Sequence, residues 1–173
     1  MNQPLPGKRA GKILMFLAWG AGLFLATRFF GDWEDRQQNP NTHVASQHGK
    51  GYIEVQLLAN RQGHFVSTGQ INGRPVEFMI DTGATDVAIP SEVADKLSLS
   101  RGVPVTVSTA NGESRGYRAV LDSLQVGDIV LRNVRAFVAP GLEGEQILLG
   151  MSAMKQLEFT QRGGTLLLRQ TTK

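Results

Sequence analysis

Closely spaced turn signals in residues 52–173 constrain the fold of this chain more than any other feature. Here short apolar runs of β-type residues are interrupted every few positions by Gly, Asn or Pro. The strongest signal is Asn72-Gly73, because both central residues of a type I′ turn need positive φ. It predicts a hairpin in which one strand ends at Ile71 and the next begins at Val76. Runs this short predict a mainly β domain.

The same pattern places the other elements of this domain. Strands are predicted over Val76–Ile80, Val87–Ile89 and Ile147–Leu149, and four more between residues 104 and 140, with turns at Asn111-Gly112, Gly127-Asp128 and near Asn133. Helices are predicted within "PSEVADKLSL" (90–99) and over Ser152–Leu157, before a hairpin that turns at Gly163-Gly164. Residues 51–173 are therefore expected to form a small closed β-barrel with one or two short helices.

An uncharged apolar run, "ILMFLAWGAGLFLAT", extends from Ile13 to Thr27. With Arg28 as an end residue and the next two phenylalanines included, it covers 13–30, enough to cross a hydrocarbon core of ~30 Å at ~1.5 Å per residue. Basic residues precede the run and acidic residues follow it. The positive-inside rule therefore predicts a cytoplasmic tail over 1–12, a single transmembrane helix and a domain on the far side. A cleaved signal peptide and a buried soluble helix are the alternatives, but no small-x-small cleavage site follows the run.

Residues 31–50 are polar, lack apolar periodicity and contain Asn39-Pro40, which predicts a flexible linker. Residues 1–50 carry six Lys/Arg and three Asp/Glu, whereas residues 51–173 carry the other twelve of each. The pI of about 9.5 therefore arises in the N-terminal region, and the domain is not expected to bind nucleic acid.

The residue inventory excludes several kinds of site. The chain has no cysteine, so a disulfide scaffold, a thiol nucleophile and a cysteine-based zinc site are excluded. His43 and His48 lie in the expected linker, and His64 lies beside Phe65 as an expected surface residue. None of them has the spacing of a metal site, and we expect no metal and no cofactor.

The sequence "EFMIDTGATDVAIP" (77–90) places the carboxylate of Asp81 directly after an apolar strand. Burial of an ionised carboxylate is costly unless it is paired or protonated. The residue is therefore either an Asx-turn aspartate that ends a strand or a group kept there for chemistry. No Gly-x-Ser-x-Gly elbow, phosphate-binding glycine loop or His-x-x-x-His motif occurs elsewhere in the sequence.

Asp81-Thr82-Gly83-Ala84 after a strand resembles the active-site loop of the single-domain, retropepsin-like aspartic proteases. The hairpin before Asp81 is similar to the first hairpin of this family. The run "ILLG" (147–150) is similar to its second hydrophobic-hydrophobic-Gly element, and "VSTANGESRGY" (107–117) stands where the family has its flap. The resemblance covers roughly Gly63 to Arg169. The bacterial membrane-anchored branch is the most similar, which implies a domain on the periplasmic side of the inner membrane.

This resemblance implies peptide hydrolysis by two carboxylates that share one proton, one as general base toward water and the other as acid toward the carbonyl oxygen. Gly83 lets backbone amides approach the carboxylates, and the Thr82 hydroxyl is implied to bond across to the facing loop. Because the chain holds one Asp-Thr-Gly, the site requires a homodimer in which Asp81 meets Asp81 of a second subunit. Anchoring both copies in one bilayer would favour this dimer, and C-terminal strands such as Thr165–Arg169 are another expected contact.

Substrate contacts follow from the family by analogy. The flap candidates are Ala110, Asn111 and Gly112, with Tyr117 beyond the turn, and the pocket candidates are Ala84, Asp86, Val87, Ala88, Ile89 and Leu148. Ala84 stands where some aspartic proteases carry a hydroxyl residue that can stabilise an ionised carboxylate. Since Ala84 cannot donate such a bond, the aspartate pair is expected to keep its proton to a higher pH. We therefore expect a weakly acidic pH optimum.

Two functions are compatible with these features. The first is a membrane-anchored aspartic endopeptidase that acts on peptides or proteins. The second is a non-catalytic peptide-binding or assembly module with the same fold. A degenerate member of the family would be expected to have lost Asp81, Thr82 or Gly83. All three are present, which favours the enzyme.

Overall fold

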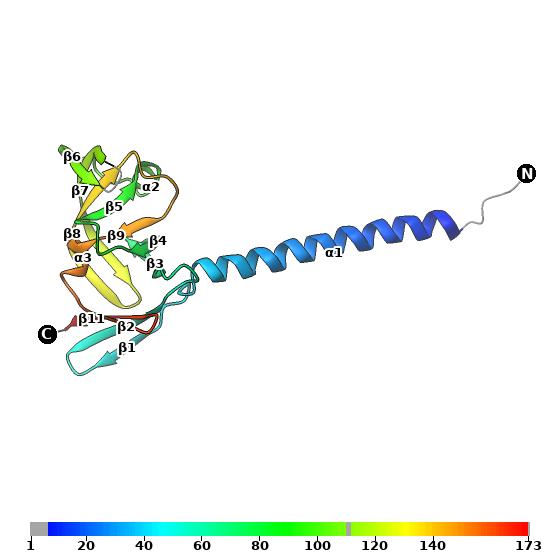
Figure 1. The fold of residues 1–173 in the computed structure, drawn as a ribbon, viewed down its shortest axis with the longest axis horizontal. Helices are drawn as coiled ribbons and strands as arrows, with labels where there is room; N and C mark the ends of the chain where they lie inside the picture. The colour runs from blue at the N-terminus through cyan, green and yellow to red at the C-terminus, as the bar shows by residue number, and fades with distance from the viewer. Residues whose placement is uncertain (1–6, 110–111, 173) are drawn as a thin grey trace, which may run out of the picture. The chain divides into compact units, whose positions relative to one another are not determined.

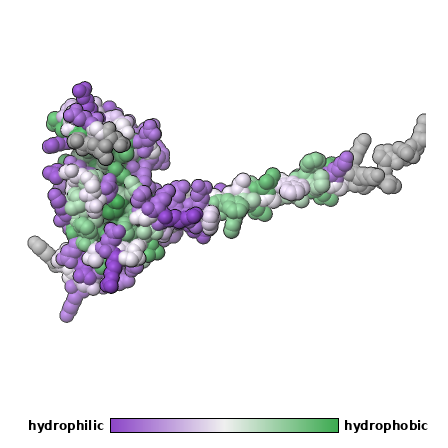
Figure 2. All heavy atoms as spheres, in the orientation of Figure 1, coloured by the Kyte–Doolittle hydropathy of each residue, from purple (hydrophilic) through white to green (hydrophobic). Residues whose placement is uncertain are grey.

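The computed structural model describes residues 7–109 and 112–172, and the chain divides into two compact units, Met1–Gln37 and Gln38–Lys173. The first unit is built on helix α1 (Gly7–Gln38), drawn in blue in Figure 1. Its large apolar side chains, among them Phe16, Trp19 and Leu23, are 49–68% exposed. Hydrophobic residues lie on the surface along the helix (Figure 2). An 18-residue window of α1 has a mean hydropathy of 1.7, so by length and composition this helix could cross a membrane.

Seven strands of the second unit form one curved sheet (Figure 1). The hairpin predicted at Asn72-Gly73 is present, and φ is positive at both residues, 50° and 77°. The strands are, in spatial order, β3 (Val66–Ile71), β4 (Arg74–Ile80), β9 (Ile147–Leu149), β5 (Val87–Pro90), β8 (Ile129–Ala139), β7 (Gly112–Val126) and β6 (Pro104–Thr109).

This sheet curls into a ring because β7 also pairs with β3. The pairing spans only two residue pairs, Gln70–Gln125 and Ile71–Leu124, since the rest of β7 extends away to pair with β6 and β8. The expected closed barrel is therefore a ring of strands that is not fully closed. The turn predicted near Asn133 is wrong: this residue has a φ of 51° inside the continuous strand β8.

A second sheet has the order β1-β2-β11-β10, and it consists of β1 (Ser46–Gly49), β2 (Tyr52–Leu58), β11 (Thr165–Thr171) and β10 (Glu158–Arg162). Alternate side chains of β2 and β11 are buried, among them Leu57 and Leu168, and they pack in the core with Phe78 from β4. The predicted hairpin at Gly163-Gly164 joins β10 to β11. All five residues of β10 are exposed.

Two short helices complete the second unit. Helix α2 (Ser91–Lys96) starts after Pro90 and buries Val93 and Ala94, as the pattern predicts. Helix α3 (Met151–Met154) starts one residue earlier and ends earlier than the predicted span. Its start is set by long-range backbone hydrogen bonds described below, which a local sequence pattern does not contain.

Residues 31–50 are not the flexible linker that their polar sequence predicts. Helix α1 continues through Gln38, Asn39 and Asn41 are buried, and β1 pairs with β2. An asparagine side chain carries both donors and an acceptor, so it can be buried where strand ends leave backbone groups unpaired. The compact unit accordingly begins at Gln38 rather than at residue 51.

Asn41 links the two sheets. Its Nδ2 donates to the Leu58 carbonyl (2.9 Å) and to the Val66 carbonyl (2.6 Å), and its Oδ1 accepts from the Leu58 N–H (2.8 Å). Leu58 ends β2 and Val66 begins β3, which belong to different sheets. One buried side chain therefore satisfies backbone groups of both sheets.

The Asn41→Ala variant should lose about 2 kcal/mol or more of unfolding free energy, because it leaves buried backbone groups without partners. Asn60→Ala is the matched control, since Asn60 also makes three hydrogen bonds but makes them near the surface. Urea unfolding of the Gln38–Lys173 fragment, followed by circular dichroism, measures both. Equal losses in the two variants would contradict a linking role for Asn41.

Candidate active site

Asp81 follows the last residue of β4 and is held by the backbone of β9. Its N–H donates to the Leu149 carbonyl (3.1 Å), and its own carbonyl accepts from the Ala84 N–H (3.2 Å). Its side-chain Oδ1 accepts a hydrogen bond of 2.9 Å from the Gly83 N–H. This is an Asx-type turn, the simpler of the two readings of the sequence. The turn uses one carboxylate oxygen, and Oδ2 has no hydrogen bond to another described residue.

The loop presents Asp81 at the surface of the second unit. Asp81 is half-buried, whereas Thr82 and Gly83 are exposed. A Cβ at Gly83 would lie 3.1 Å from Asp81 Oδ1, so glycine allows the close approach of the amide to the carboxylate. Within the described ranges, 7–109 and 112–172, the Thr82 hydroxyl has no hydrogen-bond partner. The tripeptide therefore places a carboxylate oxygen and a hydroxyl where a second molecule can reach them.

The segment after β9 packs backbone to backbone against this loop. The Met151 N–H donates to the Ala84 carbonyl (2.8 Å), and the Ser152 N–H donates to the Thr85 carbonyl (2.9 Å). A Cβ at Gly150 would lie 2.7 Å from the Ala84 carbonyl oxygen. The two motifs singled out in the sequence, "DTGA" and "ILLG", are therefore neighbours in space.

Two residues that sequence reasoning missed support the loop. Ser152 Oγ accepts from the Val87 N–H (3.1 Å) and donates to the Arg135 carbonyl (2.7 Å), so it joins the loop to β8. Arg135 Nε lies 3.4 Å from Asp86 Oδ1, close enough for an ion pair but not aligned as a hydrogen bond. Ser152 does not cap α3, whose N-cap is Gly150, so no local signal pointed to its long-range role. No local signal pointed to Arg135, 49 residues from Asp86.

The pocket candidates divide into two sets. Leu148 is paired in register with Ala88 on one side and Met79 on the other, and all three are partly exposed. Val87 and Ile89, in contrast, have no exposed surface and belong to the core. The prediction that these two residues line a pocket is therefore wrong, because side chains alternate between the two faces of β5.

The β6–β7 hairpin stands where the flap was expected. Ala110 and Asn111 lie outside the described residues. Gly112 begins β7 with a φ of 105° and is exposed. Tyr117 lies at the opposite end of the hairpin from the turn, where the Arg101 guanidinium lies 5.7 Å from its ring centre. Tyr117 is therefore distant from the tip along the hairpin.

The loop that leads into β9 is tied to α2 by an exposed ion pair between Lys96 and Glu145. The hydrogen bond from Lys96, and then its charge, lower the pKa of Glu145, and the same contacts raise the pKa of Lys96. Because both side chains are exposed, solvent and salt screen this pair, and it adds little to stability.

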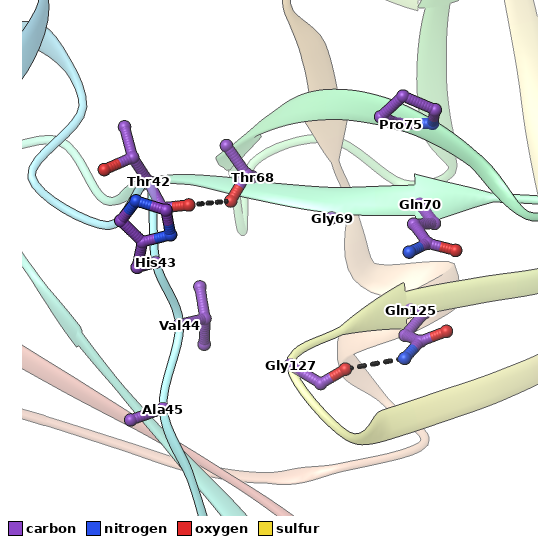
Figure 3. Close-up of a pocket in the computed structure, with 10 residues that line it drawn as sticks. All are labelled: Thr42, His43, Val44, Ala45, Thr68, Gly69, Gln70, Pro75, Gln125 and Gly127. Atoms are coloured by element: carbon purple, nitrogen blue, oxygen red, sulfur yellow. Dashed lines mark hydrogen bonds between the residues drawn. The ribbon is translucent and has the colours of Figure 1, made fainter.

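A cavity of the second unit lies away from Asp81. It has a volume of about 510 Å³ and lies between residues 42–45, β3 and the β7–β8 turn (Figure 3). Its walls include His43, Gln70 and Gln125, and Gln125 is hydrogen-bonded to the Gly127 carbonyl. None of the residues that line it belongs to the Asp81 loop or to β9. This cavity is therefore separate from the residues whose chemistry the sequence singled out.

A family model described as "gag-polyprotein putative aspartyl protease" matches residues 67–156, which include the Asp81 loop, the hairpin before it and the "ILLG" run. The chain belongs to this family. The chain is also similar to a solved structure, the crystal structure of a retropepsin-like aspartic protease from Rickettsia conorii. It matches 75% of this chain and 97% of its own length, with a TM-score of 0.60 and 29% identity. The fold of the second unit is therefore retropepsin-like.

Two curated relatives are also similar to this retropepsin-like chain. An uncharacterized protein in the cobV 5′ region of a Sinorhizobium species is 34% identical over 123 residues, which is 69% of this chain and 52% of the relative. An uncharacterized protein of Rickettsia prowazekii (strain Madrid E) is 33% identical over 109 residues, which is 61% of this chain and 46% of the relative. The chain spans about half the length of the curated relatives it matches.

The Gly150→Ala variant tests the packing of the two motifs. Its Cβ would lie 2.2 Å from the Asp86 carbonyl oxygen, and a backbone atom cannot rotate away from it. We expect a loss of about 3 kcal/mol in unfolding free energy, typical of an overpacked site. Gly141→Ala is the control, because a Cβ there meets no atom within 4 Å. Equal stability of the two variants in urea would contradict the tight packing.

Proposed function

We propose that this chain is an aspartic endopeptidase whose active site forms between Asp81 of one subunit and Asp81 of a second. The observation that carries the proposal is the state of the Asp81 carboxylate. One of its oxygens is held by the Gly83 N–H, and the other has no partner among the described residues, in a loop whose next two residues are exposed. The family membership supports the same chemistry.

The reaction would use the two carboxylates as one unit. Two carboxylates about 3 Å apart share one proton, because both cannot ionise cheaply at that distance. The ionised member takes a proton from water, which attacks the peptide carbonyl, and the protonated member donates to the carbonyl oxygen. The bonds from Gly83 N–H and to Leu149 would keep each aspartate in position during this exchange.

The second carboxylate has to come from another copy of the chain. The two nearest carboxylates in the sequence are engaged elsewhere: Glu77 accepts hydrogen bonds from Asn39 and Gln146, and Asp86 has an oxygen buried beside Arg135. The open surface at Asp81 agrees with a site that one chain only half forms. A symmetric homodimer supplies the missing aspartate and the facing loop, which the exposed Thr82 hydroxyl can reach.

Strand β10 offers an edge for this dimer. Strand β11, which contains the expected contact Thr165–Arg169, is paired on both sides within the chain, so it has no open edge for pairing with a second copy. Among the described strands, β10 pairs only with β11, and all five of its residues are exposed. If the β10 strands of two copies paired antiparallel about Thr160, Glu158 of each copy would lie opposite Arg162 of the other. The edge is therefore complementary in charge to itself.

The apolar helix α1 supports a membrane anchor for this enzyme, with residues 1–12 in the cytoplasm and the protease unit on the periplasmic side of the inner membrane. Anchoring would also confine two copies to one surface and raise their effective concentration. The substrate class that follows is peptides or proteins on that side of the membrane.

Asp81→Asn tests the catalytic role. The asparagine keeps an oxygen for the Gly83 N–H, so the fold is retained, but it cannot act as a base. Cleavage of a peptide library by the full chain in detergent should fall by about 10²–10⁴-fold. The rate of the unmodified chain should rise faster than linearly with protein concentration. A folded, dimeric chain that cleaves nothing at any pH would favour the peptide-binding module instead.

A charge exchange tests the β10 edge. Glu158→Arg alone and Arg162→Glu alone would place like charges opposite each other, and each should weaken dimerisation about tenfold. The double variant restores opposite charges and should recover the dimer. Sedimentation equilibrium of the full chain in detergent measures all three. Double and single variants that dimerise equally would rule out pairing through β10.

Ala84→Ser tests the expected pH optimum. A serine hydroxyl can donate to the ionised carboxylate and stabilise it, so the aspartate pair would lose its proton at a lower pH. The whole pH profile of cleavage should therefore move toward acid, while the dimerisation constant is unchanged. A profile that stays in place would show that residue 84 does not set the optimum.

A further inference from the structure

Residues 39–42, named the strap below, lie along β3 as the chain enters the second unit. Thr68 on β3 holds the strap twice, since its N–H donates to the Asn41 carbonyl (3.3 Å) and its Oγ1 donates to the Thr42 carbonyl (2.9 Å). Asn39 is only 4% exposed, a burial that a polar side chain tolerates when it is hydrogen-bonded. The strap is thus part of the folded unit.

Glu77 connects the strap to the segment before β9. Asn39 Nδ2 donates to Glu77 Oε2 (2.8 Å), and Gln146 Nε2 donates to Glu77 Oε1 (3.0 Å). Glu77 lies opposite Thr68 in the β3–β4 register, so this cross-strand pair binds the strap at Asn39, Asn41 and Thr42. Both bonds to Glu77 involve an ionised acceptor and a neutral amide, which makes them stronger than bonds between neutral groups.

The two strands that Glu77 bridges are those that hold Asp81. Glu77 precedes Asp81 by four residues on β4, and Gln146 directly precedes β9, whose Leu149 carbonyl binds the Asp81 N–H. The β4–β9 pairing is only three residue pairs long. The Glu77 bridge secures one end of this short pair and the Asp81 contact secures the other, about 13 Å away at ~3.3 Å per residue.

We propose that the strap positions the Asp81 loop through Asn39, Glu77 and Gln146. These are positioning residues, because they act on the register of β4 and β9 and contact no reacting atom. The proposal rests on the proposed function only in taking Asp81 as the catalytic residue. On this proposal the strap, which follows the apolar helix in the sequence, helps to position the catalytic residue. Release of the strap therefore loosens the Asp81 loop.

Glu77→Gln in the full chain in detergent is the test. The glutamine side chain keeps the shape of glutamate, but its amide nitrogen must face the amide nitrogen of Asn39 or of Gln146. One of the two hydrogen bonds at residue 77 is therefore lost. Hydrogen exchange, measured by mass spectrometry, should rise at least about tenfold in peptides that cover 78–86 and 147–152, as expected when a part-buried charge-assisted bond is lost. Exchange in the 158–171 hairpin should stay the same. If Glu77→Gln does not fold, Asn39→Ala serves the same comparison: it leaves the carboxylate and removes the bond to Glu77, together with the bond that Asn39 Oδ1 accepts from the Asn41 N–H.

Glu77→Gln combined with Gln146→Glu is the matched rescue. In that pair the residue at 77 accepts from Asn39 and donates to the carboxylate at 146, so both bonds return, and exchange in 78–86 and 147–152 should return to the original rate. Gln170→Ala is the control, because Gln170 makes two bonds to the Val130 backbone far from the strap in sequence and should leave those two peptides unchanged. An even rise over the whole unit, a rise confined to 39–45, or no rescue by the pair would overturn the proposal.

Peptide cleavage separates this proposal from the proposed function. If the chain cleaves peptides, Glu77→Gln should lower kcat several-fold with KM little changed, and the rescue pair should restore kcat. If the unmodified chain cleaves nothing, the proposed function fails, whereas the exchange measurements still decide whether the strap holds the loop.

Discussion

The second unit depends on the backbone contact between the Asp81 loop and the segment that follows β9. The Asp81 N–H binds the Leu149 carbonyl, and the carbonyls of Ala84 and Thr85 accept from the first two amides of α3. These bonds are short and directional, and they bring two backbones so close that residue 150 has no room for a side chain. They set the positions of β4, β5 and β9, and the other strands of the ring are added around these three.

The same contact is compatible with the proposed mechanism, in which each chain supplies half of the active site. The loop satisfies its own backbone groups and one oxygen of Asp81, so it is stable without a partner, yet it leaves a carboxylate oxygen and the Thr82 hydroxyl exposed. An Asx turn and a catalytic aspartate are therefore not alternatives here. The turn holds the carboxylate in place through Oδ1, and Oδ2 is the oxygen that the proposed dimer mechanism uses.

The segment between the apolar helix and the protease fold has more structure than its composition suggests. Asn41 joins the two sheets, and Asn39 reaches Glu77 between the strands that carry the loop. Polar residues at strand ends can replace missing strand neighbours, since each asparagine side chain offers an acceptor and two donors. The hydrogen bonds of Asn39 and Asn41 thus attach residues 39–42 to the second unit. The bond from Asn39 also supports the strands that carry the candidate active site.

Sequence alone determined the features that depend on neighbouring residues. The Asn72-Gly73 hairpin follows from positive φ, the helix of the first unit from a run of uncharged residues, and the family from "DTGA" and "ILLG" in order. Tertiary structure alone decided what depends on residues far apart in the chain. The two strap asparagines looked like linker, Val87 and Ile89 looked like pocket, and the ring looked like a closed barrel. The burial of a residue, the sheet face on which its side chain lies and the closure of the ring all depend on which strands become neighbours in space. A local sequence pattern does not specify that pairing.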